Sequence, residues 1–133
     1  MSSGIGAIRD QLLCSDAGES VVRVSDANHN VLVKRLAVAD RFLSRMKGLL
    51  GRSRLSQDEA LLIIPCKGVH TFGMRFAIDV LFLDKEQQVI ALISGLMPNR
   101  LTKIYASASS VLELPSGMLE MHGVCVGDRL IID

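Results

Sequence analysis

The chain has 133 residues, of which 49% are apolar, and its 15 Lys and Arg against 14 Asp and Glu give a formal net charge of +1. This length fits one domain with a substantial core, and the abundance of apolar residues excludes a disordered chain. No apolar run is longer than that of residues 60–64, which is too short to cross a bilayer. With four Phe, one Tyr and no Trp, the chain also lacks a base-stacking platform, so nucleic acid is not an expected partner.

The positive charges are concentrated in one segment. Residues 41–57 carry five bases and no acid, whereas the remaining residues carry 10 bases and 14 acids. The five bases, which we call the basic patch, are Arg41, Arg45, Lys47, Arg52 and Arg54. Arginine side chains bind phosphate and carboxylate groups, so this segment is one candidate surface for an acidic partner. The same arrangement is also typical of the solvated face of an amphipathic helix, and the sequence leaves both interpretations open.

The N-terminal residues show no basic region followed by an apolar core, so we predict a cytoplasmic protein without a secretory signal. Residues 1–18 are weakly patterned and are predicted to form a flexible lead, followed by a single β-rich domain over residues 19–133. Cys14, Cys66 and Cys125 form no C-x-x-C motif, and in a reducing compartment they are expected to be free thiols.

The first half of the chain predicts a hairpin, a helix and a strand. Residues 20–24 and 31–36 are rich in Val and flank a run of turn-forming residues, which is typical of a β-hairpin. Asp40 can cap a helix whose apolar residues recur on one face up to Leu50, with Gly51 as its stop. Residues 61–64 predict a buried strand that Pro65 ends.

Residues 72–82 show the most regular pattern, because every even position is large and apolar. This period of two predicts β structure that forms a main wall of the core, with three of the four Phe on one face. A single strand of this length would extend about 40 Å, so a bend or bulge is expected to divide it.

The last third of the chain predicts strands over 89–93, 110–114 and 129–132, and an irregular segment over 96–105. Ser116 is predicted to cap a short helix over residues 117–122. The fold class that follows is mainly β, or α+β in detail: a small antiparallel β-sandwich or barrel-like domain with one or two short helices.

Polar side chains that interrupt the apolar strands are the candidates for a ligand site. Asp79 and Glu113 are isolated acids in apolar strands, so each carboxylate is either a buried structural group or faces a cleft. If their strands pair, the two carboxylates would converge as an acid–base pair. The candidate ligand-binding residues are His70, Thr71, Arg75, Asp79, Arg100 and Glu113.

The cysteines and histidines match no common metal motif. Cys66, His70, His122 and Cys125 would supply two Cys and two His for zinc, but their spacings do not fit, and no metal is predicted. Cys66 and His70 as nucleophile and base face a geometric objection, since residues four apart in a strand are far apart. The chain contains no phosphate-loop, dinucleotide-binding, metalloprotease or serine-hydrolase motif, so no cofactor and no catalytic residue is assigned.

Four segments, in order, resemble the domain of unknown function 192 (DUF192) family: RMKGLLGR at 45–52, HTFGMRFAIDVLFLD at 70–84, VLELPSG at 111–117 and GD at 127–128. The resemblance runs from about Val22 to Ile132, nearly the whole chain. It implies a compact β-rich fold with short helices, similar to a small sandwich or barrel, and it implies no established activity.

Three functional hypotheses follow. The first is a non-enzymatic binding domain that presents the candidate residues to a small anionic ligand or a partner's chain end, with Arg75 as the charged fork and His70 and Thr71 as orienting groups. The second is a hydrolase-like enzyme in which Asp79, Glu113 or His70 acts as acid or base. The third is an interaction scaffold that docks an acidic partner through residues 41–54.

Overall fold

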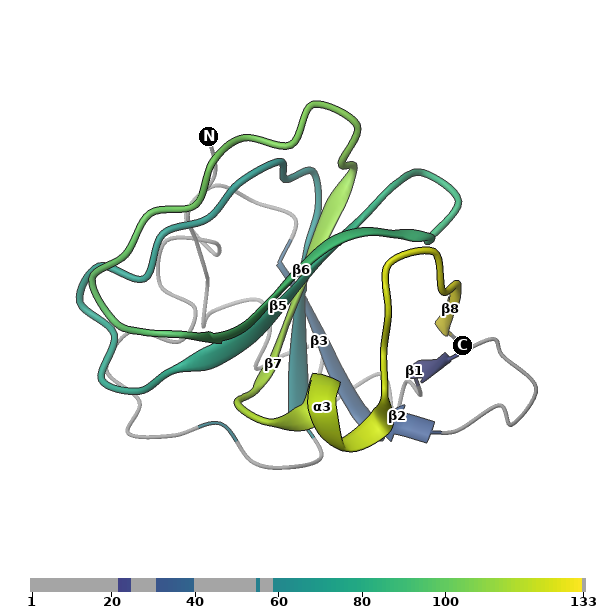
Figure 1. The fold of residues 1–133 in the computed structure, drawn as a ribbon, viewed down its shortest axis with the longest axis horizontal. Helices are drawn as coiled ribbons and strands as arrows, with labels where there is room; N and C mark the ends of the chain where they lie inside the picture. Colours follow the sequence, from purple (N-terminus) through teal and green to yellow (C-terminus); the bar gives the residue numbers. More distant parts are fainter. Residues whose placement is uncertain (1–21, 25–30, 40–54, 56–58, 133) are drawn as a thin grey trace.

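The computed structural model describes residues 22–24, 31–39, 55 and 59–132, which Figure 1 draws as a coloured ribbon. The elements are β1 (Val22–Val24), β2 (Val31–Val33), β3 (Arg35–Ala39), β4 (Glu59–Ile63), β5 (Ile78–Leu83), β6 (Val89–Leu96), β7 (Ser110–Pro115), α3 (Met118–His122) and β8 (Leu130–Ile132), labelled as in Figure 1. The predicted lead over residues 1–18, the helix predicted after Asp40 and the basic patch lie outside the described residues.

The described strands form two sheets. A five-stranded sheet has the order β3-β4-β7-β5-β6, and a three-stranded sheet has the order β2-β1-β8. β3 and β4 are parallel, and the other pairs are antiparallel. Residues 40–58 connect β3 to β4 and are numerous enough for the crossover that a parallel pair requires. The prediction of a mainly β domain is confirmed, with this one parallel exception, and the five-stranded sheet is not closed into a barrel.

The five-stranded sheet is buried on both faces, which explains the nearly continuous apolar sequences of its central strands. Every residue of β5 and β7 is buried. One face packs against β2, α3 and β8 through side chains that include Leu32, Met118 and Leu130. The other face carries a second apolar cluster, which includes Leu55 and Phe82. A polar side chain on either face of β5 or β7 is therefore removed from water, so a hydrogen bond to it can come only from within the protein.

The predicted strand over residues 72–82 is wrong in its first half. β5 begins at Ile78, and the residues before it form turns and bends. The Met74 amide donates to the Thr71 carbonyl oxygen (3.1 Å), and Gly73 has a φ of 82°, a left-handed value that interrupts an extended chain. Phe72 is consequently 49% exposed and does not belong to the core wall. The apolar pattern is divided as expected, by a turn at residues 72–73 and a bend at residues 75–76.

The other described elements agree with the prediction apart from their ends. β1 and β2 pair as the predicted hairpin, β4 ends before Pro65, and β6, β7 and β8 correspond to the three later strands. α3 lies in the predicted helical segment, but its N-cap residue is Gly117, so the prediction that Ser116 caps this helix is wrong. No helix among the described residues is long and apolar enough to cross a membrane.

Candidate functional site

Two segments, residues 66–77 and 97–108, run side by side in opposite directions and form what we call the arm. Figure 1 shows them, in teal and green, extending together away from the strands. Backbone hydrogen bonds join Tyr105 N to Lys67 O (2.9 Å), Thr102 N to Val69 O (3.0 Å) and Thr71 N to Arg100 O (2.9 Å). A Cβ atom at Gly68 would lie only 3.1 Å from the Lys103 carbonyl oxygen. The two segments are therefore in close backbone contact.

Thr71 holds the outer end of the arm together. Its hydroxyl donates to the Met97 carbonyl oxygen (2.6 Å) and accepts from the Arg100 amide (2.9 Å). Its carbonyl oxygen accepts from the amides of Met74 (3.1 Å) and Asn99 (2.9 Å). Thr71 is fully buried, so its hydroxyl does not face solvent and instead holds the two loops in position. We call this set of hydrogen bonds the Thr71 hub.

The arm is rich in basic residues. Its two segments contain Lys67, Arg75, Arg100, Lys103 and His70, and no Asp or Glu. Arg75 and Arg100 are exposed, and each directly follows a residue whose amide donates to the Thr71 carbonyl oxygen. The structure thus brings four of the six predicted ligand-binding residues, His70, Thr71, Arg75 and Arg100, to one end of the arm.

Large apolar side chains are exposed at the same end. Phe72, Met97 and Leu101 are 49%, 54% and 57% exposed. The Phe72 ring stacks on the His70 ring with centroids 4.8 Å apart, and His70 pairs with Leu101 across the arm. Sequence reasoning missed these three residues, because it placed Phe72 in the core and assigned no role to Met97 and Leu101 in the irregular segment over 96–105. The signal that could have found this end is the absence of any acid over residues 60–78 and 87–112.

His70 is held in a neutral form. The Phe72 amide donates to His70 Nδ1 (3.2 Å), so the proton of the neutral ring is on Nε2. Burial lowers the pKa of His70 from its ordinary value of 6.5. At neutral pH the ring therefore offers an N–H donor, and the fixed charge at the outer end of the arm comes from Arg75 and Arg100.

Asp79 lies in β5, two residues beyond the first segment of the arm, and links three backbone segments. Its carboxylate is fully buried and accepts from the amides of Gly95 (2.8 Å), Gly117 (3.0 Å) and Leu119 (2.9 Å). Gly95 has a φ of 68° and belongs to an irregular pairing of β6 with β5, which turns its amide toward Asp79. Gly117 and Leu119 begin α3, so a residue of β5 supplies the cap that Gly117 lacks.

Glu113 lies at the centre of the five-stranded sheet. In the register it is opposite Leu61 of β4 and Val80 of β5, on the face of the second apolar cluster. Its side chain is fully buried, and neither carboxylate oxygen has a hydrogen-bond partner in the part of the chain that is described. Burial raises the pKa of Glu113 to about 8. At neutral pH the group is therefore mainly an uncharged acid.

The sheet separates the groups of the hydrolase hypothesis. Asp79 is opposite Leu114 and Val80 is opposite Glu113, so the two carboxylates point to opposite faces. His70 lies in the arm, outside the sheet. No three His, Cys, Asp or Glu side chains within residues 22–24, 31–39, 55 and 59–132 are grouped to hold a metal ion. The described residues thus assemble neither the acid–base pair nor the zinc set that the sequence raised as alternatives.

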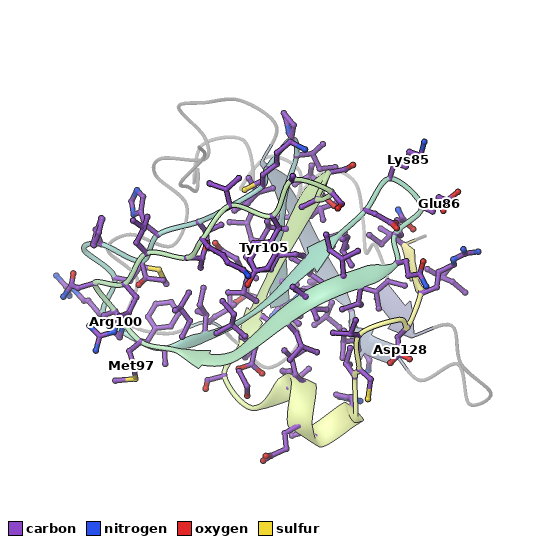
Figure 2. All side chains as sticks on the ribbon, turned by 45° about the horizontal axis from the view of Figure 1, so that its top comes forward. Lys85, Glu86, Met97, Arg100, Tyr105 and Asp128 are labelled. Carbon is purple, nitrogen blue, oxygen red and sulfur yellow. The ribbon has the colours of Figure 1, made fainter. Side chains whose placement is uncertain are left out.

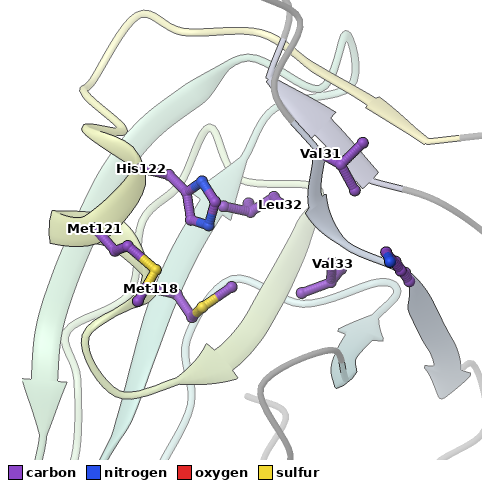
Figure 3. Close-up of a pocket in the computed structure, with 7 residues that line it drawn as sticks. Val31, Leu32, Val33, Met118, Met121 and His122 are labelled. Carbon is purple, nitrogen blue, oxygen red and sulfur yellow. The ribbon is translucent and has the colours of Figure 1, made fainter.

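A groove of about 200 Å³ lies between β2 and α3. It is lined by Val31, Leu32, Val33, Lys34, Met118, Met121 and His122, and Figure 3 shows the methionines and His122 facing β2. None of the six predicted ligand-binding residues lies in this groove. Its lining is apolar except for Lys34 and His122, so it differs in character from the arm.

Known protein families include one that matches this chain. The model of the DUF192 family, described as uncharacterized ACR, matches residues 22–132. The chain belongs to the DUF192 family. It is 35% identical over 97 residues to a UPF0127 protein of Pyrococcus furiosus, a match that covers 69% of this chain and 81% of the relative. A UPF0127 protein of Pyrococcus abyssi is 31% identical over 101 residues, covering 72% and 84%.

Two solved structures resemble this DUF192 chain. A candidate transcription regulator from Sinorhizobium meliloti matches with a TM-score of 0.75 and 20% identity, covering 86% of this chain and 94% of that one. A protein of unknown function from Novosphingobium aromaticivorans matches with a TM-score of 0.73 and 19% identity, covering 84% and 83%. At these identities the likeness establishes the fold alone.

In this DUF192 chain, Thr71→Val is expected to loosen the outer end of the arm. The substitution removes the hydroxyl that bonds Met97 and Arg100 and leaves their backbone groups without that partner, at a cost of about 1–2 kcal/mol. Hydrogen exchange at the Arg100 amide should become faster, while Thr71→Ser, which keeps the hydroxyl, should retain slow exchange. Equal exchange rates in the Val and Ser variants would contradict this role.

Proposed function

We propose that this DUF192 domain is a binding module and that the outer end of its arm takes an anionic group of a small ligand or a partner. One observation carries the proposal: Arg75 and Arg100 are both exposed beside the Thr71 hub, in an arm that contains no acid. Guanidinium groups bind phosphate and carboxylate through paired, charge-assisted hydrogen bonds. An anion at this end therefore meets two such groups and no competing carboxylate from the arm.

The remaining cations of the arm are engaged in internal contacts. Lys67 Nζ donates to the carbonyl oxygens of Ala106 (2.7 Å) and Ala108 (2.8 Å). Lys103 Nζ lies 5.0 Å from the centroid of the Tyr105 ring. Arg75 and Arg100 are therefore the residues to which we assign anion binding, with the Nε2–H of His70 as a neighbouring donor.

The loops that carry the two arginines are held by hydrogen bonds within the arm. Besides the Thr71 hub, the Gly73 amide donates to the Asn99 side-chain oxygen (3.1 Å), which joins the turn before Arg75 to the loop before Arg100. Loops fixed in this way lose less conformational entropy when a ligand binds. This supports a preformed site, and it predicts that binding leaves the backbone of the arm nearly unchanged.

The double variant Arg75→Gln with Arg100→Gln is expected to lose anion binding without loss of stability. The probes are inorganic phosphate and citrate, and the readout is the movement of amide NMR signals of residues 71–75 and 99–101. Because charge-assisted hydrogen bonds are lost, the affinity should fall at least roughly tenfold. The melting temperature should stay close to that of the unmodified protein, since both side chains are exposed.

The matched control is Lys85→Gln with Arg129→Gln, which removes the same charge from exposed positions outside the arm. This variant should bind both anions as the unmodified protein does. If the two double variants lose affinity equally, the effect reflects net charge, and the assignment of Arg75 and Arg100 is wrong.

The other two hypotheses have less support. The hydrolase hypothesis requires Asp79, Glu113 and His70 to approach one another, and the described structure keeps them on two faces of the sheet and in the arm. The scaffold hypothesis concerns residues 41–54, which lie outside the described residues, so it stays a prediction from the sequence.

A further inference from the structure

We infer that the partner of the arm is the surface of a membrane that contains anionic phospholipids. In this arrangement Phe72, Met97 and Leu101 enter the interfacial region, and Arg75 and Arg100 contact lipid phosphates. The inference rests on the proposed anion-binding function and names the source of the anion.

The side chains at the outer end of the arm match the layering of a lipid surface. Phe72, Met97 and Leu101 are each about half exposed, and they lie in the same two loops as Arg75 and Arg100. An anionic bilayer presents phosphates immediately above an apolar region, so it satisfies both kinds of side chain at once. A small soluble anion would engage the arginines and leave the apolar side chains in water.

The location of these side chains favours lipid over an acidic peptide. Peptides are usually bound in a groove or along an open strand edge. None of the side chains that line the groove between β2 and α3 belongs to the arm. Backbone hydrogen bonds from the amides of Thr71, Thr102 and Tyr105 join the two segments of the arm, and the edge strands of the five-stranded sheet, β3 and β6, lie outside it. The outer end therefore offers exposed side chains on a loop surface, the form that inserts into an interface.

The distribution of charge would orient the domain on such a surface. Figure 2 shows Met97 and Arg100 at one end of the molecule and Lys85, Glu86 and Asp128 at the opposite end. With the arm toward an anionic membrane, these three charged side chains of mixed sign face away from it. The attraction of Arg75 and Arg100 to the lipid phosphates favours this orientation, and salt should weaken it.

The absence of Trp from the chain allows a direct test of insertion. Phe72→Trp places a single Trp at the outer end of the arm, and Met121→Trp places one on α3, where Met121 is 67% exposed. With vesicles of phosphatidylcholine and phosphatidylglycerol, the emission of the residue-72 reporter should shift to the blue, and that of the residue-121 reporter should not. With vesicles of phosphatidylcholine alone, neither should shift.

Co-sedimentation with the same vesicles measures how much each side chain contributes to the affinity for the membrane. Arg75→Gln and Arg100→Gln should each lower the partition coefficient roughly fivefold, as expected for one cation near an anionic surface. Phe72→Ser should lower it by roughly tenfold through lost apolar contact. Lys85→Gln and Met121→Ser, at positions outside the arm, should leave it unchanged, and higher salt should reduce binding by all variants that retain the arginines.

The outcomes separate this inference from the proposed function. Binding of inorganic phosphate or of a polyglutamate peptide through Arg75 and Arg100, without vesicle binding, overturns the membrane inference and leaves the proposed function in place. Equal binding to vesicles with and without phosphatidylglycerol also overturns it, because the anionic lipid would not be recognised. A protein that binds phosphate, peptide and vesicles all equally poorly overturns both.

Discussion

Asp79→Ala is expected to lower the free energy of unfolding by about 4 kcal/mol. The substitution leaves the buried amides of Gly95, Gly117 and Leu119 without their common acceptor. Because these amides belong to β6 and to the start of α3, both the irregular edge of the sheet and the docking of the helix should be weakened. Urea unfolding followed by circular dichroism measures the loss.

Asp84→Ala is the matched control for this prediction. Asp84 also accepts two backbone hydrogen bonds, from the amides of Glu86 (2.8 Å) and Gln88 (3.0 Å), but it lies in a partly exposed turn where water can replace it. Its removal should cost only about 1 kcal/mol. Asp79→Asn, which keeps one acceptor oxygen, should fall between the two and provides a measurement if Asp79→Ala does not fold. Equal losses for Asp79→Ala and Asp84→Ala would show that the buried carboxylate does not cap α3.

The stability of the protein is expected to fall as the pH rises from about 4.5 to about 8, because of Glu113. Its pKa is raised to about 8 in the folded protein, from an ordinary value of 4.5. Below pH 4.5 both the folded and the unfolded chain carry the proton. Between these two pH values the unfolded chain has released the proton while the folded chain retains it. The free energy of unfolding therefore falls by up to about 1.4 kcal/mol per pH unit. Above about pH 8 Glu113 is ionised in both states, and its contribution to the free energy of unfolding no longer changes with pH.

Two substitutions test the assignment to Glu113. Glu113→Gln is neutral at every pH, so the contribution of this position to the pH slope should disappear. Glu113→Leu replaces a buried carboxyl group that has no hydrogen-bond partner among the described residues with an apolar side chain of similar size, and it should raise the free energy of unfolding at pH 8 more than at pH 5. The matched control is Glu120→Gln, on the exposed surface of α3. An unchanged pH slope in Glu113→Gln would mean that the group is already ionised in the folded protein.

The limits of the sequence prediction are visible at two places. At residues 72–76 the apolar alternation continues, but Gly73 and the hydrogen bond between Thr71 and Met74 turn the chain, and Phe72 is exposed. The alternation shows which residues are apolar. It does not show whether a neighbouring part of the chain buries them. At α3 the nearby Ser116 was the obvious cap, whereas the acceptor is Asp79, at a sequence separation of 38 from Gly117. A contact of that range leaves no periodic signal in the sequence.

Four of the six residues that the sequence analysis grouped lie together in the structure. His70, Thr71, Arg75 and Arg100 are at the outer end of the arm, where hydrogen bonds join two segments that are distant in the sequence. Asp79 and Glu113 were grouped with them because each was an acid in an apolar strand, and both are instead buried within the sheet.

The sequence by itself determined the mainly β class, the positions of most strands and the fact that two acids lie in apolar strands. These are local properties, set by the period of apolar residues and by turn-forming residues. Only the tertiary structure decided which face each acid occupies and what it contacts. In the register of β5 with β7, Asp79 faces the start of α3 and Glu113 faces the second apolar cluster. A strand register shifted by one residue would exchange those faces, and that register is fixed by the pairing of strands far apart in the chain.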